Sequence, residues 1–455
     1  MINEHDYLSL GTSNKRRETP EDHGRLGKMM SDWRLIRDFC KKSPGEINDW
    51  QFRRIKQLIR HAFNTVELYR RKYSDVGFEP GDLKGWEDFG GLPILMKDEL
   101  IDGFPNEVIS SEYDTEFTTR SSGSSGRFVT MAVSPWAVYM DTIQGARQFY
   151  FQSGGNYRAD DRALFIYTCP WWVSSIDGKY PTEFLPTTTS VQDASAKIEK
   201  IRPKILSVYP TYLKRMMGKG LNIRNSGVEL IVVHSEQTTK REREEFSDFF
   251  GVPVRDEFSS EELTRIALEC TNGKYHIEED ACYIEIVDTE NGRSITNGEE
   301  GVIIGTNLLN EATPIIRYSQ GDIGSIKDQP SCACGSNFRV MESPRGRYMD
   351  SITTKDGEII PASCFMDIAY NWYLDLDVPI HGMRYQIVQS AVDVIDIYVT
   401  KGRFDLSPSQ KRRIRNSLYQ LLPGDTSVYL HEVDEIPNSG TKYRPVLSTI
   451  NDSIW

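Results

Sequence analysis

The stretch TTRSSGSSGRFVTMAV, residues 118–133, joins a turn rich in serine and glycine to a short apolar run. No apolar residue occurs between Thr118 and Arg127, so this part cannot pack into a core. Gly123 and Gly126 allow backbone conformations in which several N–H groups point in the same direction. Together with the serine hydroxyls, N–H groups arranged in this way bind phosphate oxygens. A flexible, solvated loop is the alternative interpretation. The stretch is not a Walker A motif, because Arg127 follows Gly126 where that motif requires lysine.

Short β-rich runs alternate with helical stretches after this loop. The runs are Ala163–Tyr167, Ile205–Tyr209 and Leu230–Val233, and the helical stretches are Ala194–Ile201, Tyr212–Met217 and Lys240–Phe250. The alternation predicts an α/β fold with a parallel sheet, which binds ligands at the carboxyl ends of its strands. Candidate substrate-binding residues at or near those ends are Tyr167, Trp171, Trp172, His234, Ser235 and Glu236. For the two tryptophans, packing in the core is an equally good interpretation.

The regions on either side of this alternation have different patterns. Residues 29–75 carry apolar residues at helical spacing, whereas 282–287 and 302–306 are apolar, β-rich runs. After 346–350, further β-rich runs and one helical stretch predict a small α+β unit. We therefore expect an N-terminal arm at 1–28, a large domain at 29–346 and a small C-terminal domain at 347–455.

The composition limits the class of protein. The chain has 455 residues, of which 38% are hydrophobic and 26% are charged, and its net charge is −12. Such an acidic chain is not expected to bind nucleic acid or an anionic membrane surface. No apolar run approaches the roughly 18 residues of a membrane span, and residues 1–28 lack the apolar core of a secretory signal. We therefore expect a cytoplasmic protein without a nucleic-acid or membrane partner.

Five segments, in a fixed order, resemble the motifs of one family. They are SSGSSGR at 121–127, DEFSSEELTRIALEC at 256–270, TPIIRYSQGDIG at 313–324, GRYMD at 346–350 and IPNSGTKYRPVLS at 436–448. Together they resemble the adenylate-forming superfamily of acyl-CoA synthetases, most closely the phenylacetate–CoA ligase group and its capsule-biosynthesis relatives. The third segment is the most specific, and in it Arg317 and Tyr318 would hold the loop. The resemblance implies a large domain of sheets flanked by helices with a β-barrel-like part, and a small, mobile α+β C-terminal domain.

The resemblance assigns ATP to several of these segments. The first would hold the phosphates through Ser121, Ser122, Gly123, Ser124, Ser125, Gly126 and Arg127. Asp322 is expected to accept hydrogen bonds from both ribose hydroxyls, since a carboxylate has two suitable oxygens. Phe258 and Ser259 replace the family's tyrosine and glycine, and Phe258 would stack on adenine. Arg347 would reach the ribose or a phosphate, and Met349 replaces the family's hinge aspartate.

Two residues are candidates for the chemistry. Glu262 aligns with the family's glutamate that helps to hold Mg²⁺, a metal that prefers oxygen ligands. The adjacent Glu261 leaves the register open, and an acidic helix start capped by Ser260 is the alternative for this segment. Lys442 aligns with the lysine that contacts the carboxylate and the α-phosphate during adenylation, which suits a compact ammonium charge. Thr441 places this lysine one residue later than usual, and a solvated surface lysine is the alternative.

Cysteine and histidine residues suggest a metal site. Cys332 and Cys334 form a CxC pair, and Cys270 and His276 lie close together earlier in the chain. Three sulfurs and one imidazole form a tetrahedral ligand set for structural zinc, although the spacing is not that of a standard zinc finger. A buried Cys270 and free thiols at a turn are the alternatives. Members of the resembled group carry similar positions, so the resemblance also implies Zn²⁺.

The resemblance implies a ligase that uses ATP, Mg²⁺ and coenzyme A. It would activate a small carboxylic acid as an acyl adenylate and transfer the acyl group to the thiol of coenzyme A. The aromatic residues near the strand ends favour an aromatic or arylacetic acid. Transfer to a carrier protein or an amine is a second interpretation, and a relative that binds nucleotide or acyl ligand without turnover is a third. The resemblance also allows a homodimer.

Overall fold

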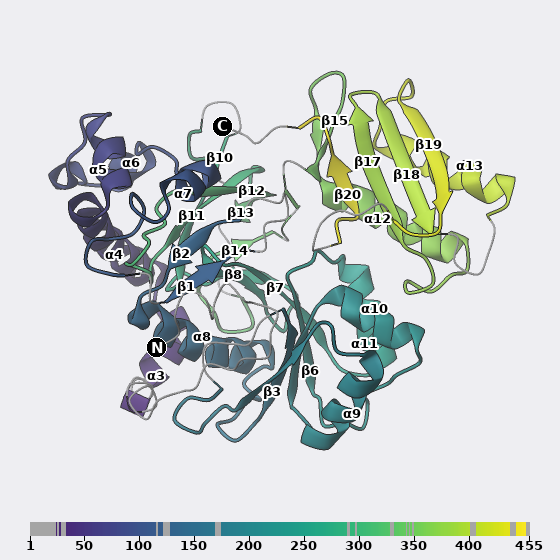
Figure 1. Cartoon of the computed structure of the whole chain (residues 1–455), viewed down its shortest axis with the longest axis horizontal. Helices are drawn as coiled ribbons and strands as arrows, with labels where there is room; N and C mark the ends of the chain where they lie inside the picture. Colours follow the sequence, from purple (N-terminus) through teal and green to yellow (C-terminus); the bar gives the residue numbers. More distant parts are fainter. Residues whose placement is uncertain are drawn as a thin grey trace.

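The structure is a computed structural model of the chain (Figure 1). It describes residues 24, 27–28, 33–114, 117–121, 128–168, 174–288, 292–295, 298–327, 332–342, 344, 346–347, 350–400, 406–436 and 443–451. Among these residues, no helix combines the length and the apolar character needed to traverse a lipid bilayer.

A sheet of nine strands, counted over the described residues, runs through the larger part of the molecule in the order β13-β14-β9-β8-β7-β6-β5-β3-β4. The parallel strands are β3 (Ala163–Tyr167), β4 (Thr182–Pro186), β5 (Ile205–Val208), β6 (Leu230–His234) and β7 (Val254–Ser260). Antiparallel pairs continue the sheet through β8 (Thr264–Glu269), β9 (Tyr275–Ile277), β14 (Val340–Met341) and β13 (Ile326–Lys327). The predicted parallel sheet of an α/β fold is therefore confirmed.

Helices cover both faces of this sheet. On one face lie α9 (Val191–Ile201), α10 (Pro210–Gly218) and α11 (Lys240–Phe250), and on the other lies α8 (Pro135–Gln152) (Figure 1). Successive side chains of a strand point to opposite faces. Accordingly, Leu164 and Ile166 of β3 share a core with α9, α10 and α11, whereas Ala163 and Phe165 share one with α8. Tyr167, at the carboxyl end of β3, departs from this alternation and packs against the core shared with α9, α10 and α11.

The segment from 256 to 270 forms a β-hairpin rather than a helix. It contains most of β7 and all of β8, which pair in antiparallel register. In the turn between them, the Leu263 N–H donates to Ser260 Oγ at 3.1 Å. The alternative interpretation of an acidic helix start is therefore wrong. A separate three-stranded antiparallel sheet follows, formed by β10 (Cys282–Val287), β11 (Gly301–Asn307) and β12 (Tyr318–Gly324).

The helical region predicted at 29–75 is present but divided. Its described elements are α3 (Trp33–Asp38), η1 (Phe39–Lys41), α4 (Pro44–Thr65) and α5 (Glu67–Ser74). Ser43 caps α4 and Pro44 occupies its first turn, where a missing N–H costs nothing. After η2 (Pro80–Asp82), the short helices α6 (Trp86–Gly90) and α7 (Lys97–Gly103) lead to the hairpin of β1 (Thr118–Arg120) and β2 (Thr130–Ala132).

The last part of the chain forms a compact α+β unit beside α10 and α11 (Figure 1). Its four-stranded sheet has the order β19-β18-β17-β20. Its elements are β15 (Ile352–Thr353), β16 (Ile359–Ile360), α12 (Ala362–Asp375), β17 (Tyr385–Ala391), β18 (Val394–Thr400), α13 (Pro408–Ser417), η4 (Leu418–Gln420), β19 (Ser427–Val433) and β20 (Val446–Ser448). Tyr370 of α12 donates to Glu245 Oε2 of α11 at 3.2 Å, and Arg241 Nη1 donates to Asn371 Oδ1 at 2.8 Å. The predicted domain limits stay predictions.

Candidate active site at the carboxyl ends of the parallel strands

The serine- and glycine-rich segment lies in the sequence between β1 and β2, which pair as a hairpin. Ser121 closes the base of this loop twice: its N–H donates to the Val129 carbonyl, and its Oγ accepts from the Val129 N–H, both at 2.9 Å. The Ala132 N–H donates to Thr313 Oγ1 at 3.0 Å, which ties the hairpin to the start of the segment 313–324. The hairpin that flanks the first motif segment therefore lies beside the third segment.

Glu261 and Glu262, in the turn after β7, point to different partners. Glu261 accepts from Thr119 Oγ1 at 2.7 Å and from the Tyr167 hydroxyl at 3.5 Å, so it bridges the base of the loop and the end of β3. Glu262 is buried and accepts from the Tyr318 hydroxyl at 3.3 Å. Burial raises the pKa of Tyr318 well above its ordinary value, so this phenol stays a neutral donor. The turn therefore connects the second segment to β1, which directly precedes the first segment, and to the third segment.

Asp322 and Arg347 bring the third and fourth segments together. They form an isolated antiparallel bridge, and the Ile323 N–H donates to the Gly346 carbonyl at 2.9 Å. Arg347 Nε lies 3.9 Å from Asp322 Oδ1. The side chain of Asp322 is 12% exposed and that of Arg347 is 41% exposed. Gly321, just before Asp322, has a φ of +80°, which glycine adopts without strain. A carboxylate and a cation thus lie side by side where the third and fourth segments meet.

Arg317 holds the loop of the third segment from inside the core. It is 2% exposed; its Nε donates to Glu285 Oε2 at 3.1 Å and its Nη1 to the Gly90 carbonyl at 2.6 Å. Its own carbonyl accepts from the Leu95 N–H at 2.8 Å. These contacts fix the start of β12 against the segment between α6 and α7. Arg317 therefore has the loop-holding contacts expected from the sequence, without facing a ligand.

An aromatic cluster lies at the carboxyl ends of β3, β5 and β6. Tyr167 stacks on Tyr209 with ring centroids 5.6 Å apart, and the ring of His234 meets both edge-on at 5.2 and 5.1 Å. His234 Nδ1 lies 2.9 Å from Ser235 Oγ. Sequence reasoning missed Tyr209, although its position as the last residue of a predicted strand was the available signal. This cluster offers a flat, partly polar wall beside Glu261.

Glu236 contacts a helix end. Both of its carboxylate oxygens accept from Thr211 at 3.0 Å, one from the backbone N–H and one from the hydroxyl. Thr211 lies in the first turn of α10, where a carboxylate is favoured by the unpaired N–H groups and the helix dipole. This arrangement favours a positioning role for Glu236 over contact with a substrate.

The other predicted site residues divide into two groups. Phe258 and Ser259 lie in β7, at the point where its register with β8 shifts, and Phe258 is half-buried against the core. The rest lie outside the described residues: Ser122, Gly123, Ser124, Ser125, Gly126, Arg127, Trp171, Trp172, Met349 and Lys442. Their roles stay predictions.

Cys270, His276, Cys332 and Cys334 converge at the other end of β8, away from the turn that carries Glu261. Their ligand atoms all lie within 4.8 Å of one another. His276 Nδ1 lies 3.0 Å from the Phe338 carbonyl, which leaves Nε2, 3.3 Å from Cys334 Sγ, on the cluster side. Such a second contact orients metal-binding histidines. The donor set and its geometry fit a tetrahedral zinc ion.

Comparisons with known proteins find similarity to CoA ligases. No protein-family model matches the chain. A phenylacetate–coenzyme A ligase of Aromatoleum evansii is 27% identical over 341 residues, which are 70% of this chain and 75% of that protein. A phenylacetate–coenzyme A ligase of Escherichia coli (strain K12) is 23% identical over 430 residues, 88% of this chain and 94% of that protein.

Solved structures show the same fold. A 2-hydroxyisobutyryl-CoA ligase in its postadenylation state aligns with a TM-score of 0.72 and 19% identity, covering 90% of this chain and 91% of the other. An anthranilate CoA ligase in complex with anthranoyl-AMP aligns with a TM-score of 0.52 and 14% identity, covering 70% and 64%. The comparisons therefore confirm both the predicted resemblance and the predicted two-domain α/β fold.

Proposed function

We propose that this chain, a relative of the adenylate-forming CoA ligases, activates a carboxylic acid with ATP and transfers the acyl group to coenzyme A. The observation that carries the proposal is that the second, third and fourth motif segments contact one another, and that the second also contacts β1, which directly precedes the first. Glu261 meets the base of the loop, Glu262 meets Tyr318, and Asp322 meets Arg347. If these segments were ordinary turns, contacts between them would have no common purpose. Their contacts instead support a single nucleotide site formed by all of them.

The reaction needs two displacements. A carboxylate oxygen attacks the α-phosphorus of ATP, the bond to the β-phosphate oxygen breaks, and pyrophosphate leaves. The thiol of coenzyme A then attacks the acyl carbon, and AMP leaves as the thioester forms. Mg²⁺, held by Glu262, would offset negative charge on the triphosphate. Asp322 would position the ribose, and Lys442 would stabilise the charge that develops on the α-phosphate.

We infer that the C-terminal unit changes position between the two displacements. The 2-hydroxyisobutyryl-CoA ligase aligns with this chain at a TM-score of 0.72 in its postadenylation state and at 0.60 in its thioesterification state. This difference supports an adenylation-side position for the C-terminal unit. A swing about residues 346–350 would exchange the Tyr370–Glu245 and Arg241–Asn371 hydrogen bonds for others.

A screen of carboxylic acids by ATP–pyrophosphate exchange tests the proposed function. We expect one class of acids to support exchange, and we expect those same acids to give thioesters with coenzyme A. Exchange without thioester formation would redirect the second step to a carrier protein or an amine. ATP binding without exchange for any acid would contradict the proposal and leave a non-catalytic binder.

Glu262→Gln is expected to raise the Mg²⁺ concentration needed for half-maximal exchange by about tenfold or more, because it removes an anionic oxygen ligand. Glu261→Gln is the matched comparison, since it changes a neighbouring side chain of the same type. We expect Glu261→Gln to leave the Mg²⁺ dependence unchanged, because the Glu261 carboxylate accepts hydrogen bonds from Thr119 and Tyr167. The opposite pattern would assign the metal to Glu261.

The four-ligand cluster at the end of β8 is proposed as a structural zinc site. It lies at the opposite end of this strand from the turn with Glu261, roughly 20 Å away at about 3.4 Å per residue. Its proposed role is to join the strand connection after β8 to the turn before β14, without taking part in the chemistry.

A further inference from the structure

An ion pair joins the last motif segment to the segment between the two domains. Arg444, in the segment 436–448, pairs through Nη2 with Oδ1 of Asp350, the last residue of the segment 346–350. Their side chains are 22% and 14% exposed, so water and salt screen this pair less than an ion pair on the open surface. The fourth and fifth motif segments are therefore in direct contact.

Asp350 is tied to the edge of the site that carries Asp322. The Asp350 N–H donates to the Arg347 carbonyl at 3.0 Å, and Ser351 Oγ donates to the same carbonyl at 3.2 Å. The side chain of Arg347 in turn lies beside Asp322, the candidate ribose contact. The segment 346–350 therefore links the predicted ribose contact to Arg444.

The backbone at Arg444 is held by β17 of the C-terminal unit. The Arg444 carbonyl accepts from Gln386 Nε2 at 3.0 Å, and the hydroxyl of the preceding Tyr443 donates to the Tyr385 carbonyl. The strand β20 follows directly and forms an edge of the C-terminal sheet, on the side nearer the larger part of the molecule in the view of Figure 1. Arg444 is therefore anchored in the C-terminal unit, while its side chain reaches the connection to the large domain.

Tyr443, next to Arg444, also lies close to the large domain. Burial, followed by the neighbouring Tyr373, raises the pKa of Tyr443, and the charge of Lys214 on α10 opposes this rise. Lys214 Nζ is itself held by Glu242 Oε1 of α11 at 2.6 Å. The chain that leads into β20 therefore lies where the C-terminal unit meets α10.

We propose that Arg444 is a positioning residue for the first displacement, and that its ion pair with Asp350 fixes the chain next to Lys442 beside the nucleotide. Lys442 precedes Arg444 by two residues, and two residues of chain span at most about 7 Å. Anchoring Arg444 therefore limits the distance over which the lysine can move. The inference rests on the proposed function, in which Lys442 acts on the α-phosphate, and it adds the contact that brings this lysine there.

The test measures the two displacements separately. The first is followed as ATP–pyrophosphate exchange with the acid that gives the highest rate in the screen of carboxylic acids. The second is followed as thioester formation from coenzyme A and the synthetic acyl adenylate of that acid. Arg444→Gln is expected to lower kcat of exchange by about a hundredfold, because a displacement of about 1 Å at a reacting group costs that much. Thioester formation from the acyl adenylate should stay close to that of the unmodified protein, because the proposed mechanism gives Lys442 no part in the second displacement.

Asp350→Asn keeps the shape of the side chain and should give the same imbalance between the two steps. Because Arg444 and Asp350 are proposed to act through one contact, the double variant should lose no more exchange activity than either single variant. Losses that multiply in the double variant would show that the two residues act separately, and would overturn the inference.

Arg415→Gln, at an exposed position in the last turn of α13, is the matched control and should leave both steps unchanged. Equal losses of both steps in Arg444→Gln would overturn the inference, since they would indicate a general effect on the fold. Unchanged exchange in that variant would overturn it as well. If no acid supports exchange with the unmodified protein, the proposed function fails and this inference fails with it, so the two failures are distinguishable.

Discussion

Asp322→Ala is expected to lower kcat/KM for ATP in pyrophosphate exchange by roughly a hundredfold or more. The lost interactions are two hydrogen bonds from ribose hydroxyls to an ionised carboxylate, each worth about 1.5–3 kcal/mol. Because about 1.4 kcal/mol corresponds to a factor of ten, their sum gives at least two orders of magnitude. Steady-state exchange at varied ATP concentration measures the effect. A large part should appear in KM, since the ribose is bound before and during the reaction.

Two comparison variants make this prediction specific. Asp322→Asn keeps the shape and one acceptor oxygen, so we expect an intermediate loss. Asp75→Ala changes an exposed aspartate at the end of α5 and should have no effect. Asp322 is buried and close to Arg347, so the melting temperature of each variant must be measured alongside. A folded Asp322→Ala protein with exchange within twofold of the unmodified chain would contradict the assigned ribose contact.

The fold was largely predictable because its main signals are local. The runs that became β3, β5 and β6 are apolar and rich in branched residues, and the helices between them have periodic apolar positions. The exact direction of side chains in turns was not predictable. Glu261 and Glu262 are adjacent and have the same side chain, so the sequence does not distinguish them. The three-dimensional position of the β7–β8 turn decides that Glu261 contacts Thr119 and Glu262 contacts Tyr318.

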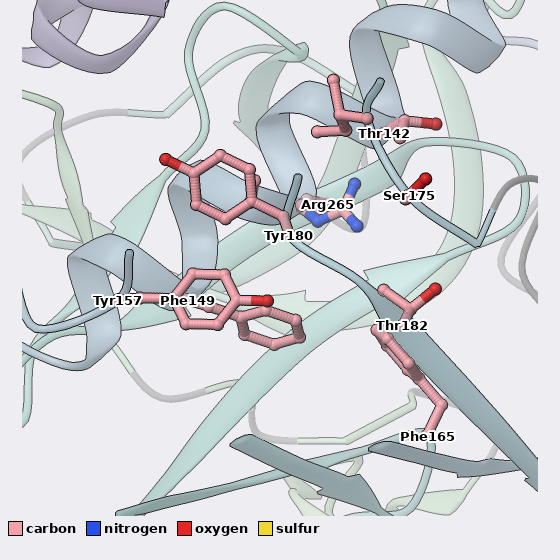
Figure 2. Close-up of a pocket in the computed structure, with 11 residues that line it drawn as sticks. Thr142, Phe149, Tyr157, Phe165, Ser175, Tyr180, Thr182 and Arg265 are labelled. Atoms are coloured by element: carbon pink, nitrogen blue, oxygen red, sulfur yellow. The ribbon is translucent and has the colours of Figure 1, made fainter. Parts of the chain in front are cut away.

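The parts of the site that escaped prediction depend on long-range packing. The sequence predicted Glu236 as a substrate-binding residue at a strand end. In the structure its carboxylate instead accepts hydrogen bonds from Thr211 in the first turn of α10, because that helix begins beside it. A pocket between α8, β3, β4 and β8 combines residues from a helix, three strands and the connections between them (Figure 2), and no spacing in the sequence relates Phe149 to Arg265. The motifs therefore predicted a nucleotide site, whereas this pocket was visible only in the three-dimensional structure.

Loss of the proposed zinc ion is expected to have the largest effect on stability. The purified protein should contain about one zinc ion per chain, and Cys332→Ser should lose it. Structural zinc contributes on the order of 10 kcal/mol to the folding of small zinc domains. In this chain the ion would join Cys270 to residues 62 positions later, so its loss would release two separate connections. We expect the melting temperature to fall by about 5 °C or more.

Metal analysis and thermal unfolding, with and without a chelator, measure this effect. Burial opposes ionisation of the Cys332 thiol, but hydrogen bonds from the Cys334 N–H and from His276 and Asn272 lower its pKa to about 6, so the thiolate that zinc requires is available. Cys364→Ser in α12 is the matched control, since it removes a thiol outside the cluster. Zinc-free protein with full stability would reject the assignment. A Cys332→Ser variant that loses zinc and stability but keeps the same preference among acids would show that the cluster supports the fold and not the chemistry.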